Sequence, residues 1–503
     1  MEQGSRTEPE EGTTGSGSTA LVSGMRWSGV SVIGREACRV VFTVALARMV
    51  GPEAFGIVAQ AVVYIGIVGL LLDQGFSSAL IQRPRLSDDM AGAVVTVNLA
   101  VGALLTAVTV AVAPAWAAFM DSPELTAVLA VLACSMFIRA LAITPRALLL
   151  RGMHFRKIGI ADISGAAVGG ILGVVAAALG AGYWALVVQI VTTDLVMALV
   201  LFLVGAGSRP NLHLRRLREI AGFSWRAFAA GILINSVSRN IDNLLVGRFH
   251  GPQQLAFYGL AYRLLLLPVQ LATTTIGAVL FPAFSRLADD LNALRTEMAR
   301  ATRALATLAL PGMALVAASA PQVVLLVFGP QWIPAVPIVQ ILATVGALQA
   351  VYQPTTTPLV LGLGHARLNL RLAWLITVLA TVGIVAGLPF GAQGVAIGYT
   401  AATALLIPVE WFIRRRLLGM TVRGQVAMLV PGVHVAIWVV MIYLLVALAI
   451  TGHDLVVLLL GVPAAAAAGV VVLRVFHPAQ LAELIRVSRR LVVRARPRTA
   501  GES

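Results

Sequence analysis

Long apolar stretches recur from one end of the chain to the other, separated by short polar segments. Each stretch is close to the roughly 20 residues that a helix needs to cross a bilayer. Only helices and closed barrels satisfy their backbone groups in lipid, and these stretches are of helical length. The predicted spans, about 14 in number, are residues 28–50, 54–81, 90–119, 124–145, 158–180, 182–205, 222–247, 253–282, 303–328, 335–362, 367–389, 392–413, 425–450 and 454–474. The pattern therefore predicts an all-α polytopic membrane protein.

The loops between these spans alternate in charge. Odd-numbered loops are short and poor in Lys and Arg, whereas even-numbered loops carry nearly all the loop arginines, from Arg83 and Arg85 after the second span to Arg423 after the twelfth. Basic loops stay on the cytoplasmic side of a membrane. We therefore expect a multi-pass protein of the plasma (inner) membrane with both termini in the cytoplasm.

Composition supports the prediction of a membrane protein and argues against a nucleic acid partner, a disulfide framework and a metal centre. Hydrophobic residues make up 59% of the chain and charged residues 12%, and the mean hydropathy is +0.90. The formal charge of +15 would suggest nucleic acid binding in a soluble protein, but membrane orientation explains these arginines, so no nucleic acid partner is expected. Cys38 and Cys134 both fall inside predicted spans, so neither a disulfide framework nor a metal centre is expected, and no cofactor is predicted.

The chain also repeats itself. Residues 47–55, with Gly51-Pro52, are echoed at 247–255, with Gly251-Pro252. Further matches in nearly the same register pair Arg39 with Arg239 and Leu86-Ser87-Asp88-Asp89 with Leu287-Ala288-Asp289-Asp290. A second echo pairs Leu150, His154 and Arg156 with Leu361, His365 and Arg367. An even number of spans separates Arg39 from Arg239, so the two copies share one orientation. This predicts two parallel six-helix lobes followed by two C-terminal helices.

The predicted organisation follows from the repeat. It comprises a disordered cytoplasmic tail (1–24), an N-lobe (25–208), a C-lobe (209–420), the last two spans (421–475) and a basic cytoplasmic tail (476–503). In the last segment Leu481, Leu484, Ile485 and Val492 stand at helical spacing among arginines. This pattern predicts an amphipathic helix lying on the anionic membrane surface, with a merely solvated basic tail as the alternative.

Four motifs in the lobes have a family resemblance. They are residues 73–82, 146–157, 239–248 and 281–287. Taken in order, they resemble polysaccharide-exporting flippases of the Wzx type, which belong to the multidrug/oligosaccharidyl-lipid/polysaccharide (MOP) transporter superfamily. The resemblance spans about residues 25 to 420. It implies a transporter, not an enzyme, that turns a lipid-linked saccharide from the cytoplasmic to the outer leaflet. The implied partners are this substrate and membrane lipids, together with enzymes of the same pathway such as glycosyltransferases or a polymerase.

Such a transporter must carry a hydrated sugar-phosphate head through hydrocarbon. Each buried hydroxyl without a partner costs about 4 kcal/mol or more on alkane scales, and a bare phosphate costs far more. We therefore expect a polar, cationic cavity between the lobes, lined by ionisable and amide side chains from within the spans. The substrate-binding candidates are Arg35, Glu36, Arg39, Asn235, Arg239, Asp242, Asn243, Gln270, Gln349 and Gln353, and the gating or coupling candidates are Asp73, Arg139, Asp194 and Pro268.

Arg39 and Arg239 are repeat equivalents. Because guanidinium forks match phosphate oxygens, we expect this pair to hold a pyrophosphate across the cavity. The alternative is that Arg39 pairs with Glu36, and Arg239 with Asp242, as structural ion pairs. Asp162, Arg226 and Glu410 lie near cytoplasmic ends of spans and are predicted to be snorkelling or capping residues.

Four other functions are alternatives to this one. A lipid II flippase for peptidoglycan would use the same mechanism with another substrate. An ion-coupled multidrug antiporter would favour an acidic cavity, whereas this one is rich in arginine. A membrane glycosyltransferase would need a large outward loop with carboxylates, and an ATP-driven pump a Gly-rich phosphate loop with its Lys; the sequence has neither. Alternating access by two rocking lobes is the expected mechanism.

Overall fold

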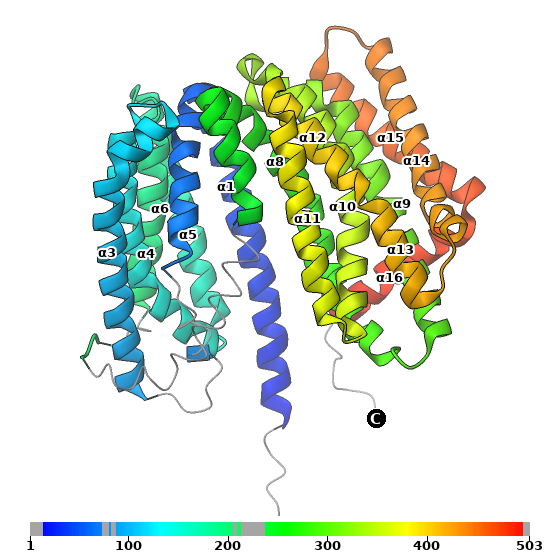
Figure 1. Ribbon diagram of the computed structural model, residues 1–503, viewed down its shortest axis with the longest axis horizontal. Helices are drawn as coiled ribbons and strands as arrows, with labels where there is room; N and C mark the ends of the chain where they lie inside the picture. Colours follow the sequence, from blue (N-terminus) through cyan, green and yellow to red (C-terminus); the bar gives the residue numbers. More distant parts are fainter. Residues whose placement is uncertain (1–13, 73–79, 82–86, 205–208, 213–236, 496–503) are drawn as a thin grey trace, which may run out of the picture. The chain divides into compact units, whose positions relative to one another are not determined.

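The computed structural model describes residues 14–72, 80–81, 87–204, 209–212 and 237–495 (Figure 1). Every regular element in this part is a helix. The main helices are α1 (Thr14–Gly69), α3 (Asp88–Met120), α4 (Leu125–Arg151), α5 (Phe155–Ala178), α6 (Trp184–Leu203), α8 (Val237–Arg286), α9 (Leu291–Val323), α10 (Val336–Gly362), α11 (Ala366–Gly387), α12 (Gly391–Leu405), α13 (Ile407–Leu418), α14 (Val422–Ala449), α15 (Asp454–Phe476) and α16 (Pro478–Ala495). A π-helical turn (Val324–Phe328) and two short 3-10 helices (Pro330–Ala335 and Leu388–Phe390) complete the described part.

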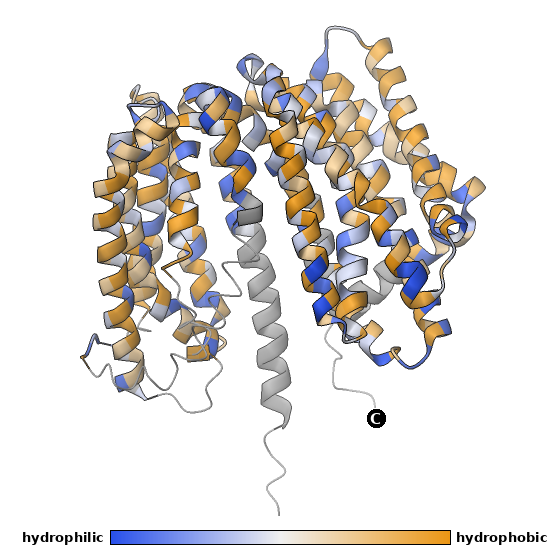
Figure 2. Cartoon of the chain, viewed as in Figure 1, coloured by the Kyte–Doolittle hydropathy of each residue, from blue (hydrophilic) through white to orange (hydrophobic). Residues whose placement is uncertain are grey.

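The helices have the length and composition of membrane spans. In the described residues, 10 helical segments are long and apolar enough to cross a bilayer. One of them, Ala366–Leu418, contains three consecutive helices. Hydrophobic positions predominate along the helices of the whole bundle (Figure 2). The predicted all-α polytopic class is confirmed, whereas the number of 14 spans stays a prediction because some spans lie partly outside the described residues.

Glycine turns separate successive spans at repeat-equivalent places. Within α1 the helix breaks at Gly51 (φ 84°, ψ 169°), and within α8 it breaks at Gly251 (φ 79°, ψ −179°). Gly329 (φ 98°, ψ 171°) and Gly391 (φ 75°, ψ −168°) adopt the same conformation before α10 and α12. This region of backbone space is open almost only to glycine. The Gly-Pro echo in the sequence is therefore an echo of one backbone turn.

Replacing Gly251 with alanine is expected to destabilise the protein by about 1–3 kcal/mol, because a Cβ makes this backbone conformation strained. No atom lies within 4 Å of the position that the Cβ would take, so the cost comes from the backbone alone. Gly259→Ala is the matched control, because Gly259 lies in the same helix and its added Cβ also meets nothing within 4 Å. Thermal unfolding of the purified protein in detergent compares the two variants, and equal midpoints would contradict this explanation.

The second sequence echo also marks a shared turn. Met153 (φ 57°) and Gly364 (φ 76°) both have left-handed backbones. After each of them a histidine N–H bonds back to the preceding helix, His154 to the Leu149 carbonyl and His365 to the Val360 carbonyl, each at 2.9 Å. The ends of α4 and α10 are thus built alike.

Glycines bring two helix pairs into backbone contact. A Cβ on Gly169 of α5 would lie 2.7 Å from the Gln189 carbonyl oxygen of α6, and one on Gly383 of α11 would lie 2.3 Å from the Gly398 carbonyl oxygen of α12. Small residues allow helices to approach this closely in lipid, where packing and not water exclusion drives association.

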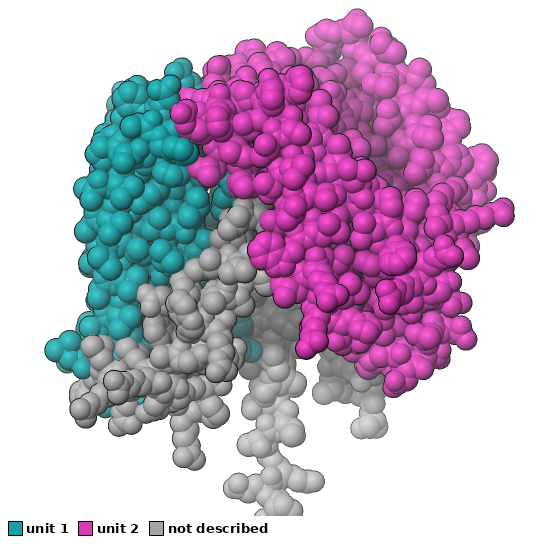
Figure 3. Space-filling model, viewed as in Figure 1, with its two compact units in different colours: residues 1–240 teal, residues 241–503 magenta. Residues whose placement is uncertain are grey.

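The chain forms two compact units, residues 1–240 and 241–503 (Figure 3). In the first unit an apolar cluster joins α4, α5 and α6 around Ala161 and Leu201. In the second, one cluster surrounds Phe284 and Met298, and another joins α14 and α15 around Tyr443. The lobe boundaries at 208/209 and 420/421 stay a prediction.

The C-terminal helix α16 packs against protein. Leu481 and Leu484 contact the apolar cluster of α14 and α15, and Glu483 Oε1 pairs with Arg300 Nε of α9 at 2.6 Å. At the start of α16, His477 Nε2 lies 3.1 Å from His434 Nδ1 of α14, and burial together with this neighbour lowers the pKa of His477. The predicted amphipathic helix is present as α16. Leu481 and Leu484 are partly buried against protein, whereas Ile485 is 43% exposed, and the side chain of Val492 lies outside the described part. The position of this helix on the membrane surface stays a prediction.

The twelfth predicted span, 392–413, is also not one helix. α12 ends at Leu405, and α13 begins at Ile407 with Pro408 in its first turn. Proline is favoured in the first turn of a helix because its missing N–H has no partner there. The break places Trp411 and Arg414 on a helix of their own.

Candidate functional site

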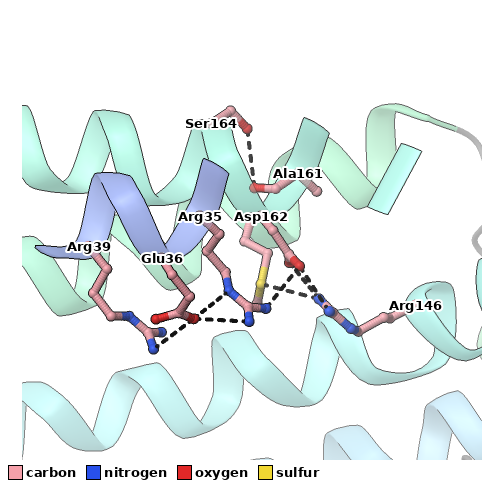
Figure 4. A network of polar contacts seen from close by, with 8 residues as sticks. Arg35, Glu36, Arg39, Arg146, Ala161, Asp162 and Ser164 are labelled. Atoms are coloured by element: carbon pink, nitrogen blue, oxygen red, sulfur yellow. Dashed lines mark hydrogen bonds and ion pairs between the residues drawn. The ribbon is translucent and has the colours of Figure 1, made fainter. Parts of the chain in front are cut away.

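Charged side chains gather between the membrane-spanning helices of the first unit (Figure 4). We call this group the arginine cluster. α1 contributes Arg35, Glu36 and Arg39, α4 contributes Arg139 and Arg146, and Asp162 and Asp194 come from α5 and α6. These helices are otherwise strongly apolar, and ionisable residues inside membrane spans are rare and usually functional.

Asp162 organises one end of the cluster. Its side chain is only 8% exposed. Arg146 donates two hydrogen bonds to it, from Nη1 to Oδ1 at 2.7 Å and from Nη2 to Oδ2 at 3.0 Å, and Arg35 Nη1 donates a third to Oδ2 at 3.3 Å. The parallel pair of bonds from Arg146 is the strong, bidentate geometry of a guanidinium and a carboxylate. One buried carboxylate thus joins α1, α4 and α5.

Glu36 continues the arginine cluster along α1, where it contacts two arginines. Its Oε1 accepts from Arg35 Nε at 3.1 Å and lies 3.5 Å from Arg39 Nη1. The ion pair between Arg39 and Glu36, considered from the sequence as an alternative to substrate binding, is therefore present. It leaves the Arg39 side chain 62% exposed. An exposed arginine, held loosely by a carboxylate, keeps most of its donors available.

Arg139 and Asp194 form a second pair, with Nε 2.8 Å from Oδ2. Asp194 is buried, whereas the Arg139 side chain is 43% exposed. Arg39 also lies within electrostatic reach of Asp194, so the two parts of the cluster act on one another. Four guanidinium groups face three carboxylates here, which leaves one excess positive charge.

The cluster suits an anion that carries several oxygens. A guanidinium has five N–H donors in a planar fork that matches phosphate. Asp162 and Glu36 fix Arg35 and Arg146, while Arg39 and Arg139 are the most exposed members. The arrangement thus provides two available cations on a rigid polar base. The chemistry that these guanidinium groups offer is the binding of an anion.

Sequence reasoning missed two members of this cluster. Asp162 was expected to snorkel or cap a helix, which is wrong because its carboxylate is buried between helices. Arg146 was assigned to a loop, but α4 continues to Arg151. A signal existed in the sequence, since Asp162 lies in a glycine-rich apolar stretch where an unpaired carboxylate would be costly.

A second polar group lies in the second unit. Asp242, which is buried, accepts from the Asn243 backbone N–H at 2.8 Å and from the Tyr258 hydroxyl at 3.1 Å. Tyr258 stacks on Tyr262, Tyr262 contacts Tyr399, and Gln349 Nε2 donates to the Tyr399 hydroxyl at 2.8 Å. Three tyrosines that the sequence did not single out thus link the predicted Asp242 and Gln349.

The remaining candidates divide into two groups. The side chains of Gln270 and Gln353 are exposed. Asp73 and Asn235 lie outside the described residues, as do the side chains of Arg239 and Pro268, whose backbones belong to α8. The expected pairing of Arg39 with Arg239 across a cavity therefore stays a prediction. In the described part, no group of three or more His, Cys, Asp or Glu residues is arranged to hold a metal ion.

The chain also has recognisable relatives. The profile of a family described as "Polysaccharide biosynthesis protein" matches residues 45–337. The chain belongs to this family. Within the polysaccharide biosynthesis proteins, it is 24% identical to the lipopolysaccharide biosynthesis protein WzxC of Escherichia coli, covering 80% of this chain and 83% of the relative. It is 26% identical to the teichuronic acid biosynthesis protein TuaB of Bacillus subtilis, covering 72% and 75%.

A third relative and two solved structures agree with this assignment. The succinoglycan biosynthesis transport protein ExoT of Rhizobium meliloti is 27% identical over 72% of each chain. The lipid II flippase MurJ in its inward closed conformation superimposes with a TM-score of 0.70, covering 89% of this chain and 98% of that one at 11% identity. An inward-facing MATE transporter of the MOP superfamily gives 0.59, covering 76% and 98% at 19% identity. The chain therefore shares the fold of a transporter of the MOP superfamily.

Proposed function

We propose that this polysaccharide biosynthesis protein is a flippase that moves a lipid-linked oligosaccharide or polysaccharide precursor from the inner to the outer leaflet of the plasma membrane by alternating access. The observation that carries the proposal is the arginine cluster, which places exposed guanidinium groups inside apolar helices. Relatives of this chain are proteins of lipopolysaccharide, teichuronic acid and succinoglycan biosynthesis, which supports a saccharide as cargo.

The cluster would meet the main physical demand of this reaction. A phosphate-bearing saccharide head loses its water as it enters the membrane, and charge-assisted hydrogen bonds replace part of that hydration. Arg39 and Arg139 would contact the phosphate oxygens, while Asp162 and Glu36 hold the neighbouring arginines in place. The lipid tail needs no polar site because it stays in lipid. Enzymes of the same pathway, such as glycosyltransferases or a polymerase, would form the covalent bonds. The arginines in the even-numbered loops favour an orientation with both termini in the cytoplasm.

The second candidate is a lipid II flippase. The fold shared with MurJ favours it, but the relatives by sequence are polysaccharide biosynthesis proteins. A multidrug antiporter is less compatible with the cluster, because its excess positive charge would repel a cationic drug.

Charge reversal of Arg39 tests the proposal. In vesicles reconstituted with purified protein and a lipid-linked oligosaccharide, we expect Arg39→Glu to slow the appearance of saccharide at the opposite face by roughly 10-fold or more, equivalent to a loss of at least about 1.4 kcal/mol of binding. Accessibility to a membrane-impermeant glycosidase measures the transfer. The reason is that a carboxylate beside Glu36 repels the anionic head.

Arg474→Glu is the matched control, because Arg474 is an exposed arginine of α15, far along the chain from the cluster. Wild-type rates in Arg39→Glu would exclude the cluster as the binding site. Absence of transfer by the wild-type protein would contradict the flippase function, and faster transfer of lipid II than of the oligosaccharide would favour the second candidate.

A further inference from the structure

A second arginine of unusual environment lies in the second unit. Arg414 of α13 is 1% exposed. Its Nη2 donates to the Thr355 and Thr356 hydroxyls of α10 at 2.7 and 2.9 Å, and its Nη1 lies 3.4 Å from the Thr302 hydroxyl of α9. The guanidinium also sits over the Tyr352 ring, 4.7 Å from its centre. Its Nε is buried without a hydrogen-bond partner among the described residues.

A carboxyl group lies one helical turn before this arginine. Glu410 lies near Thr356, the same threonine that accepts from Arg414. One carboxyl oxygen of Glu410, Oε2, is buried and has no partner in the described part of the chain. In that part, no carboxylate oxygen comes within the 4.0 Å of an ion pair with Arg414. A carboxyl group and a guanidinium thus lie close together without forming an ion pair.

The unpaired oxygen indicates which form of Glu410 fits this arrangement. An ionised carboxylate with a bare, buried oxygen pays a large desolvation cost. A protonated carboxyl is neutral and needs fewer acceptor contacts. The expectation that Glu410 is a snorkelling or capping residue is wrong, because its Oε2 is shielded from solvent. The geometry fits the protonated acid, with Arg414 bound elsewhere.

We propose that Glu410 is a proton-binding site whose ionisation moves Arg414 between two sets of partners. With the proton bound, Arg414 stays on Thr355 and Thr356. When the proton leaves, the carboxylate attracts the guanidinium four residues along the same helix face, and the two hydrogen bonds to α10 weaken. One proton is exchanged with water, and no covalent bond to carbon changes.

The exchange acts on a weak part of α10. Thr355 and Thr356 lie between Pro354 and Pro358, each of which removes one intrahelical hydrogen bond. Arg414 therefore stabilises α10 at the point where its intrahelical hydrogen bonds are interrupted. Among the described residues, the titratable groups near Glu410 are Arg414 on α13 and Tyr352 on α10. On the neighbouring helices α9 and α14, the neutral Thr302 contacts Arg414 and the neutral Gln425 donates to the Trp411 carbonyl. Release of the proton frees α10 to bend.

Infrared difference spectroscopy of the purified full-length protein tests the proton site. Titration with alkali is expected to remove a carbonyl-stretch band of a buried protonated carboxyl, and Glu410→Gln is expected to lack this band at every pH. Glu124→Gln is the control, because Glu124 is an exposed glutamate that caps nothing with its side chain. A band unchanged in Glu410→Gln would overturn the proposal. Gel filtration verifies that the near-isosteric variant is folded.

Hydrogen exchange tests the link to α10. After correction for the intrinsic effect of pH, amides around Thr355 and Thr356 should exchange about 10-fold faster in the alkaline form of the wild-type protein, and Glu410→Gln should stay protected. Equal exchange in both proteins across the titration would overturn the link. The inference rests on the proposed function only for its purpose in transport. Neither readout uses a saccharide, so a failed vesicle assay with an intact infrared band would reject the flippase and not the proton site.

Discussion

Replacing Asp162 with asparagine is expected to lower the free energy of unfolding by about 3 kcal/mol. Removing one partner from a buried ion pair leaves the other charge uncompensated, and such losses run to about 3–5 kcal/mol. The lower value applies here because Arg35 and Arg146 are each about one-third exposed, so solvent screens part of their charge. Two arginines on two helices lose their common acceptor at once. The midpoint of thermal unfolding in detergent, monitored by helical circular dichroism, measures the effect.

Asp289→Asn provides the matched control, because this exposed aspartate undergoes the same chemical change without a buried partner. It should leave the midpoint unchanged. The Asp162 variant should also slow saccharide transfer, since Arg35 is no longer held beside Glu36. An Asp162→Asn protein as stable as wild type would mean that Arg35 and Arg146 find other acceptors, and the central role of Asp162 would have to be abandoned.

Replacing Gly383 with leucine is expected to prevent α11 from packing on α12. Even a Cβ at this position would lie 2.3 Å from the Gly398 carbonyl oxygen and 2.8 Å from the Ala402 Cβ. The first obstacle is backbone, so a rotamer change cannot relieve it, and the helices must separate. The expected cost exceeds about 3 kcal/mol, the upper end for overpacking. The yield of monodisperse protein, measured by fluorescence-detected gel filtration, should fall steeply.

Gly312→Leu controls for the size of the new side chain. Gly312 lies within α9, and a Cβ there meets nothing within 4 Å. Gly383→Ala should fall between this control and the leucine variant. Normal yield of the Gly383→Leu protein would show that α11 and α12 do not approach as closely as the geometry requires.

The features that sequence reasoning predicted well are those that local chemistry determines. Apolar length identifies a span, and Gly51 and Gly251 stand out because a glycine followed by proline interrupts a helix regardless of its neighbours. The side of a helix that contacts the rest of the protein is harder to predict. Leu481 and Leu484 pack partly against protein, and the sequence alone does not reveal this contact because an apolar side chain suits protein and lipid alike. Such partners are properties of the assembled fold.

The same distinction applies to the site. Arg35, Glu36 and Arg39 were identified because charge within an apolar helix is costly and therefore conspicuous. The tyrosines around Asp242 carried no such signal, since a tyrosine suits a membrane helix whether or not its hydroxyl binds a carboxylate. Glu410 and Arg414 were visible as charges, but their position near a span end concealed their burial, which depends on the break before α13.

The glycine turns bear on how the two halves of this chain diverged. The turns at Gly51 and Gly251 depend on the absence of a side chain and not on contacts with neighbouring residues. Mutations of those neighbours therefore leave the turns in place. The first half was thus able to accumulate guanidinium groups and the second to acquire phenol rings beside Asp242. A single inherited scaffold came to enclose two chemically unlike interiors.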